Sequence, residues 1–174
     1  MADVRRAIGI VPQETFLFSE PLRDNVLLGT PDDGRLDDAA AVAQLDQALP
    51  DLPNGWETML GERGINLSGG QRQRAAIARA LVRQPSVLVL DDALSAVDAQ
   101  TEMEILAALE RATDEHTRII VSHRFSAVRN ADQILVLDEG RIVERGSHEQ
   151  LVAAAGRYTE LLMRQELEAS LDIQ

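Results

Sequence analysis

The chain has 174 residues, 45% of them hydrophobic, and a formal net charge of −12, which is the composition of a soluble globular domain with its own core. It contains no cysteine, which excludes a disulfide framework and a cysteine-based metal site, and its acidity argues against nucleic-acid binding through a basic surface. No apolar run approaches the ~20 residues that span a bilayer.

The first half of the chain predicts one strand and two longer helices. Residues 7–11 form a short apolar run that ends at a proline, as a strand does, and a loop with a short helix follows. Residues 36–49 have the pattern of an amphipathic helix closed by Pro50 and Pro53. After a glycine-punctuated loop, another helix begins at Ser68 and runs to the next proline.

The second half alternates strands and helices. Residues 87–90 and 118–121 are continuous apolar or mostly apolar runs, the pattern of parallel strands buried on both faces. A helix is expected over residues 98–112, and a hairpin over 133–144 that turns around Glu139 and Gly140. Residues 147–171 are expected to be mostly helical, with a break near Gly156. This alternation indicates an α/β domain, into which residues 36–49 and their flanks are inserted as an all-helical part.

A serine followed by two glycines stands at the expected start of a helix, in the run Leu67–Gln71. Backbone N–H groups and the positive end of the helix dipole point outward there, and glycine allows a phosphate to approach closely. Ser68, Gly69, Gly70 and Gln71 are therefore candidate anion-binding residues. A plain serine N-cap explains the same residues, and on this segment alone both interpretations stay open.

Polar residues also follow three expected strands. Asp91 and Asp92 come after one of them, at the strand end where open α/β sheets bind ligands. Asp91 is a candidate Mg²⁺ ligand and Asp92 a candidate base for an attacking water, although two acids starting a loop are common. Taken alone, His123 is best interpreted as a loop histidine without a functional role, and Gln13 does not indicate any function.

Together these segments resemble the ATP-binding-cassette (ABC) family over essentially the whole chain. Five motifs occur in the family's order and at comparable spacing. They are the Q-loop at Ile10–Gln13, the signature at Leu67–Gln71, the Walker B strand at Val87–Asp91, the D-loop at Ser95–Asp98 and the switch-histidine segment at Val121–Arg124.

Three further segments resemble exporters in particular: Thr15–Ser19, Gly61–Gly64 and Arg145–Glu149. Only about 55 residues separate Gln13 from Ser68, and no long coiled coil lies between them. The DNA-repair and chromosome-structure members of the family carry such a coiled coil, so they fit less well.

The resemblance implies an α/β fold, a partial P-loop NTPase (RecA-like) core with a mostly parallel sheet, plus an all-helical ABC subdomain. Residues 1–174 would form one nucleotide-binding domain. The helical subdomain with the signature would span about residues 20–85. Residues 1–19 and 86–174 would form the rest of the α/β core.

All 17 basic residues are arginine, so no lysine can complete a G-x-x-x-x-G-K-[ST] phosphate loop. In the family that loop and the adenine-stacking aromatic residue lie upstream of the Q-loop. Arg5 and Arg6 resemble the segment that leads into the first strand. We therefore expect Met1 to be an internal start, from a gene fragment, a split gene or a truncation. The isolated chain would then bind ATP weakly and be inactive as an ATPase.

The resemblance also implies ATP and Mg²⁺ and a head-to-tail pair of motor domains attached to a transmembrane domain at the cytoplasmic face of the cell membrane. Ser68, Gly69, Gly70 and Gln71 would bind the γ-phosphate of ATP held by the partner domain. Within the chain's own site, the implied residues are Gln13 and Asp91 for Mg²⁺, Gln13 and Asp92 for the attacking water, His123 for the γ-phosphate, and Asp98 for coupling between the two sites.

Asp92 stands where the family usually has glutamate. The shorter side chain suggests the slow half of an asymmetric exporter, whose signature completes the partner's ATP site; the alternative is a homodimer in which Asp92 works well enough. A different class of function is a non-hydrolytic fragment, or regulatory module, that keeps only the dimer surface.

Overall fold

The computed structural model describes residues 4, 7–113 and 116–171. The chain divides into two compact units, Met1–Val121 and Ser122–Gln174, and each is described by itself. The segment around Arg5 and Arg6, likened above to the approach to the first strand, lies outside the described residues.

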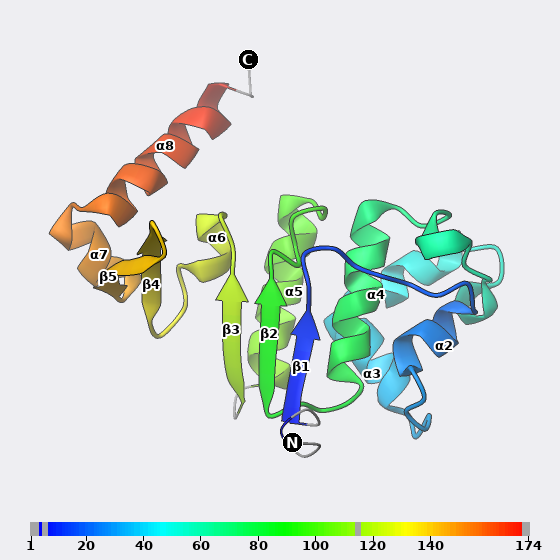
Figure 1. Ribbon diagram of the computed structural model, residues 1–174. Helices are drawn as coiled ribbons and strands as arrows, with labels where there is room; N and C mark the ends of the chain where they lie inside the picture. Colours follow the sequence, from blue (N-terminus) through cyan, green and yellow to red (C-terminus); the bar gives the residue numbers. More distant parts are fainter. Residues whose placement is uncertain (1–3, 5–6, 114–115, 172–174) are drawn as a thin grey trace. The chain divides into compact units, whose positions relative to one another are not determined.

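The first unit is built on a parallel three-stranded sheet. Its strands β1 (Ile8–Val11), β2 (Val87–Asp91) and β3 (Thr117–Val121) lie side by side in the order β1-β2-β3 (Figure 1). The register places Val11 opposite Leu90, and Asp91 opposite Val121. All three strands therefore end at the same edge, and the predicted α/β fold with a mostly parallel sheet is confirmed.

Helices α4 (Gly69–Leu81) and α5 (Ala99–Ala112) provide the apolar cover of this sheet. Helix α4 packs against β1, and α5 lies behind the sheet in Figure 1. Both helices were predicted from the sequence. The core shared by sheet and helices includes Val11, Ile77, Leu88, Leu90, Ile105 and Leu109.

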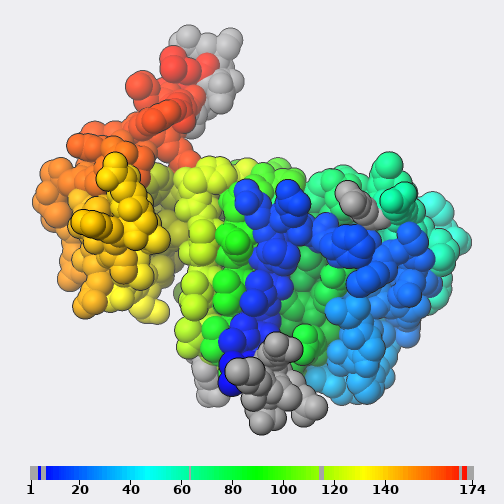
Figure 2. All heavy atoms as spheres, viewed as in Figure 1, coloured from blue at the N-terminus to red at the C-terminus, as the bar shows by residue number. Residues whose placement is uncertain are grey.

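The prediction that β2 and β3 are buried on both faces is wrong. Ile10 is 61% exposed, Ile119 48% and Val121 52%, while Leu88 and Leu90 on the other face are buried. Figure 2 shows the strands uncovered on the near side. Among the described residues, helices of this unit cover one face only, and an apolar run cannot indicate how many faces are covered.

The all-helical part contains α2 (Leu22–Leu27), α3 (Arg35–Val42) and three 3₁₀ turns, η1 (Asp46–Asp51), η2 (Gly55–Glu57) and η3 (Glu62–Gly64). Helices α2 and α3 pack against α4, the helix that begins with the signature residues. This is the helical insertion that the sequence predicted.

The predicted helix over residues 36–49 ends early, at Val42. Gln44 adopts a left-handed φ of 54°, and the N–H of Leu45 bonds back to the carbonyl of Ala40 at 2.8 Å, which is the Schellman arrangement that stops a helix. The residue in the left-handed position is glutamine instead of the usual glycine, so no sequence signal marked the stop. Pro50 lies inside η1 and does not close the helix.

Asn25 on α2 holds the segment that follows the first strand. Its side chain is fully buried; Oδ1 accepts from the N–H of Phe18 at 2.7 Å, and Nδ2 donates to the carbonyls of Phe18 and Glu20 at 3.0 and 3.2 Å. Arg79 of α4 donates to the carbonyls of Asn25 and Phe16, both at 2.8 Å. The loop after Gln13 is thereby tied to the helix of the signature.

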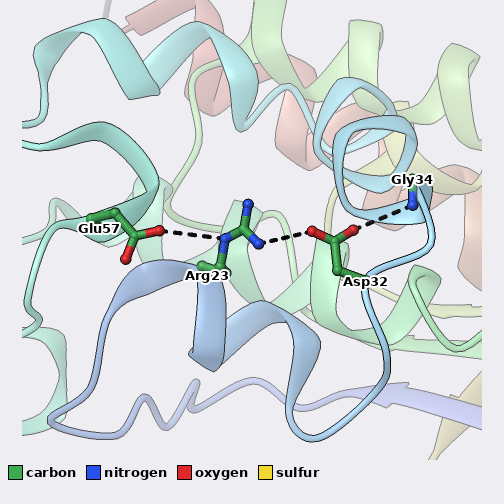
Figure 3. A network of polar contacts seen from close by, with 4 residues as sticks. All are labelled: Arg23, Asp32, Gly34 and Glu57. Carbon is green, nitrogen blue, oxygen red and sulfur yellow. Dashed lines mark hydrogen bonds and ion pairs between the residues drawn. The ribbon is translucent and has the colours of Figure 1, made fainter.

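A second polar network in the helical part is exposed (Figure 3). Arg23 pairs with Asp32 at 2.9 Å and with Glu57 at 3.4 Å, and the N–H of Gly34 donates to Asp32 at 3.3 Å. These contacts link α2 to the start of α3 and to η2. Exposed ion pairs of this kind stabilise a fold by about 0–1 kcal/mol each.

The two networks predict different effects on stability. Asn25→Ala is expected to destabilise the chain by about 2 kcal/mol or more, because it leaves buried backbone groups without partners. Arg23→Ala is the matched control on the same helix and should cost less than about 1 kcal/mol. Urea unfolding followed by circular dichroism measures both, and equal losses would contradict the prediction.

The second unit contains α6 (Phe125–Val128), the antiparallel pair β4 (Ile134–Asp138) and β5 (Arg141–Gly146), α7 (His148–Ala154) and α8 (Arg157–Leu171). The hairpin predicted around Glu139 and Gly140 is confirmed; both have positive φ, as a two-residue type I′ turn requires. The predicted break near Gly156 separates α7 from α8. Searched over the described residues, the chain holds no helix of sufficient length and apolarity to cross a bilayer.

Candidate functional site

The carboxyl-terminal edge of the sheet brings two candidate residues together. Gln13 follows β1 and Asp92 follows β2, 79 positions later, and the Nε2 of Gln13 donates to Oδ2 of Asp92 at 3.5 Å. The parallel register of β1 and β2 produces this meeting, because it places Val11 level with Leu90. Asp91, the last residue of β2, stands exposed at the same edge.

The backbone of Asp92 is held at both ends in an unusual conformation. Its φ is 47°, in the left-handed region, which aspartate tolerates better than most residues. Its N–H donates to the carbonyl of Val121 at 2.8 Å, and its own carbonyl accepts from the hydroxyl of Ser95 at 2.9 Å. The backbone that carries the carboxylate is thus fixed by hydrogen bonds to β3 and to Ser95 in the same loop.

The signature residues form the N-terminus of α4. Ser68 is its N-cap in a complete capping box: its hydroxyl accepts from the N–H of Gln71 at 3.1 Å, and the side chain of Gln71 accepts from the N–H of Ser68 at 2.9 Å. The capping interpretation is therefore correct. It does not compete with anion binding, because the N–H groups of Gly69 and Gly70 have no intrahelical acceptor in helix geometry.

Gly70 lies against the loop that follows β2. A Cβ at this position would stand 3.1 Å from the carbonyl oxygen of Ala96 and 3.3 Å from Cγ1 of Val97. At Gly69 a Cβ would stand 3.2 Å from Cβ of Ala96. The two glycines therefore allow the start of α4 to pack closely on the D-loop residues of the same chain.

Asp98 caps α5. Its Oδ1 accepts from the N–H of Thr101 at 3.0 Å and its Oδ2 accepts from the hydroxyl of Thr101 at 2.7 Å. The backbone hydrogen bond, and then the hydroxyl, hold the pKa of Asp98 below its ordinary value of 3.8. In this chain the carboxylate therefore already has a local partner, whatever it does across an interface.

This lowered pKa predicts a pH effect. A carboxyl whose folded pKa lies below its unfolded value adds stability above the unfolded value, about 3.9, and loses that contribution as the pH falls through the folded pKa. Thermal unfolding of Asp98→Asn should therefore differ most from that of the wild type at neutral pH. The difference should shrink as the pH falls from 3.8 downward. A difference that is constant from pH 7 to pH 2 would contradict this.

His123 follows β3 by two residues and is the second residue of the second unit, which begins at Ser122. Its backbone carbonyl accepts from Nε2 of Gln165 at 3.1 Å, and Oε1 of the same glutamine accepts from the N–H of Phe125 at 3.0 Å. Helix α8 therefore orients the segment that carries His123. The side chain of His123 is exposed.

The residues present suit Mg²⁺ as part of a larger ligand set. Asp91 offers a carboxylate and Gln13 an amide oxygen, since its nitrogen is used by Asp92, and Mg²⁺ prefers oxygen ligands. Within residues 4, 7–113 and 116–171, no group of three or more His, Cys, Asp or Glu could hold a metal alone. The remaining ligands would be water and phosphate oxygens, which is how proteins commonly hold this ion.

The sequence interpretation missed one residue near this site, Gln73. It is a buried glutamine on the inward side of α4, four residues before Ile77. A polar residue at a core-facing helical position was the signal that could have identified it, because buried amides need partners.

Three comparisons bear on this arrangement. The family model described as "ABC transporter" matches residues 1–95. A multidrug resistance protein 1 of Entamoeba histolytica is 45% identical over 97% of this chain and 13% of that protein. An uncharacterized ABC transporter ATP-binding protein, YknU of Bacillus subtilis, is 50% identical over 91% of the chain and 27% of that protein.

Among solved structures, a bacterial Atm1-family ABC exporter with ATP bound is similar to 93% of this chain, with a TM-score of 0.89 and 42% identity. The similarity covers 29% of that exporter chain. The chain thus spans between about an eighth and three tenths of the length of these relatives.

Proposed function

The chain belongs to the ABC transporter family, and from this premise we propose that it is part of the ATP-hydrolysing motor of a membrane exporter, at the cytoplasmic face of the cell membrane. The contact between Gln13 and Asp92 is the observation that carries the proposal. It places an amide that can orient a water molecule beside a carboxylate that can accept its proton.

Asp91 lies at the same edge, and His123 is carried by the second unit. Asp91 and Oε1 of Gln13 would hold Mg²⁺, which when bound neutralises charge on the phosphates of ATP. Asp92 would take the proton of the attacking water. The side chain of His123 would contact the γ-phosphate, and α8 orients its backbone through Gln165.

A second motor domain is the proposed partner, arranged head to tail. Ser68, Gly69, Gly70 and Gln71 would bind the γ-phosphate of the ATP held by that domain, through N–H groups at the start of α4. Asp98 would couple the two sites across the interface. The helical part that carries this signature, about residues 20–85, and the α/β core from 1–19 and 86–174 would form one motor domain.

An exposed apolar surface offers a contact for the transmembrane domain. Phe16 is 52% exposed, Phe18 42%, Met59 58% and Ile65 79%. The phenyl rings of Phe16 and Phe18 meet edge to face, with their centroids 5.0 Å apart. A β-bridge between Pro21 and Met59 holds the two segments together. Exposed apolar patches of this kind commonly mark protein contacts.

Two further points belong to the proposal. Asp92 replaces the longer glutamate, and we propose that this chain is the slow half of an asymmetric pair; a homodimer in which Asp92 suffices is the alternative. The second candidate function is a regulatory module that dimerises without hydrolysing ATP. It is favoured by the same substitution, because a shorter carboxylate lies farther from its target.

The test is ATP hydrolysis by the full-length protein in membranes, with and without Mg²⁺. We expect Mg²⁺-dependent hydrolysis that His123→Ala lowers by about tenfold or more, since one positioned contact to the reacting phosphate is lost. Gln47→Ala, an exposed change on η1, should leave the rate unchanged. ATP-dependent dimerisation without hydrolysis would establish the regulatory module instead. A protein that neither dimerises with ATP nor hydrolyses it would refute both functions.

A further inference from the structure

Gln73 connects the helix of the signature to the loop of the D-loop residues. Its side chain is 6% exposed, and both ends of its amide are bonded. Nε2 donates to the hydroxyl of Ser95 at 3.0 Å, and Oε1 accepts from the N–H of Ala96 at 2.8 Å. These are contacts between positions more than twenty residues apart in the sequence.

The direction of each hydrogen bond follows from the chemistry of the groups. The N–H of Ala96 can only donate, so the amide oxygen of Gln73 must face it and the amide nitrogen must face Ser95. The hydroxyl of Ser95 accepts from that nitrogen and donates its own hydrogen to the carbonyl of Asp92 at 2.9 Å. Two consecutive hydrogen bonds therefore connect α4 to the backbone of Asp92.

Gln73 also lies next to the turn of α4 that packs against this loop. It is one turn beyond Gly69 and Gly70, on the same side of the helix, and those glycines pack against Ala96 and Val97. The start of α4 thus contacts the loop through bare backbone, and the next turn holds it through the glutamine amide. If α4 shifts and these hydrogen bonds are kept, the loop must move with it.

We propose that Gln73 is a positioning residue that transmits a movement of the signature helix to Asp92. This rests on the proposed function, in which Ser68 and Gly70 meet the ATP of the partner domain while Asp92 serves the chain's own site. Phosphate binding at the start of α4 pulls on Gln73, and Ser95 passes the displacement to the carbonyl of Asp92. Asp92 is sensitive to it because its left-handed backbone is held by hydrogen bonds at both ends.

The experiment is hydrogen exchange measured by mass spectrometry on the full-length protein, with and without ATP and Mg²⁺. The variants are Gln73→Met, which keeps the length of the side chain and removes both hydrogen bonds of the amide, and Ser95→Ala. The second variant removes the hydroxyl that joins Gln73 to Asp92 and keeps the bond from the N–H of Ala96 to Gln73. Gln47→Met makes the same chemical change at an exposed position of η1 and is the control.

In the wild type and the control, we expect nucleotide to slow exchange in both peptides, 68–72 and 92–97. In Gln73→Met and Ser95→Ala, the response of 68–72 should remain and the response of 92–97 should fall about tenfold, the size of a typical coupling between sites. The exchange of the Ala96 amide should rise in Gln73→Met but not in Ser95→Ala.

A response of 92–97 that equals the wild type's in both variants would overturn the inference. A wild type in which nucleotide changes neither peptide would instead refute the proposed function. Should Gln73→Met fail to fold, Ser95→Ala alone decides, because it is a small change at a partly exposed position.

Discussion

Replacing Gly70 by valine is expected to lower ATP hydrolysis by the full-length protein by about 10²-fold or more, the loss typical of removing one preorganised contact to a developing charge. The new side chain would begin 3.1 Å from the carbonyl oxygen of Ala96 and 3.3 Å from Val97. Helix α4 must therefore move away from the loop, and its free N–H groups move with it. The added methyl groups also obstruct the approach of a phosphate to the helix end.

The same change should destabilise the domain, by about 1–3 kcal/mol for an overpacked contact. Gly70→Ala adds only the Cβ, so its effects on the rate and on stability should be intermediate. Ala41→Val, which places a β-branched residue at an exposed position of α3, is the control and should leave the rate unchanged. ATPase rates and thermal unfolding measure the series. A Gly70→Val protein that hydrolyses ATP at the wild-type rate would show that this helix end does not meet phosphate.

The order of elements could be predicted because it follows from local patterns. Gln13 and Asp92 were assigned to one site only through the resemblance to the ABC family, and the parallel pairing of β1 and β2 explains why they meet. Strand runs and the serine before two glycines are local signals that tertiary packing did not override in this chain. Strands that end in polar residues then place those residues at one edge, whichever side chains fill the core.

Other features depended on tertiary context. The stop at Val42 rests on a glutamine in a left-handed conformation, which packing imposes and composition does not announce. The exposure of Ile10 and Ile119 depends on which elements lie over each face of the sheet. The amide of Gln73 finds its partners only in a loop that comes 22 and 23 positions later, so the sequence around Gln73 does not indicate its role.

Asp92→Glu is expected to raise ATP hydrolysis by the full-length protein with its partner by about 10²-fold, if the chain is the slow half of an asymmetric pair. The contact from Gln13 to Asp92 is long, at 3.5 Å. One more methylene group would extend the carboxylate by ~1.5 Å toward the reacting atoms, and a misplacement of ~1 Å can cost ~10²-fold in rate.

The cost of this change should appear in stability. Asp92 has a φ of 47°, a conformation that aspartate tolerates and glutamate adopts less readily, so the variant should be less stable by about 1 kcal/mol. Asp51→Glu lengthens an exposed carboxylate at the end of η1 and should change neither property. A faster but less stable Asp92→Glu protein would mean that the short side chain slows the site and, at the same time, lowers the strain of the left-handed backbone. An unchanged rate, or a wild type that is already a fast homodimer, would remove the asymmetric interpretation.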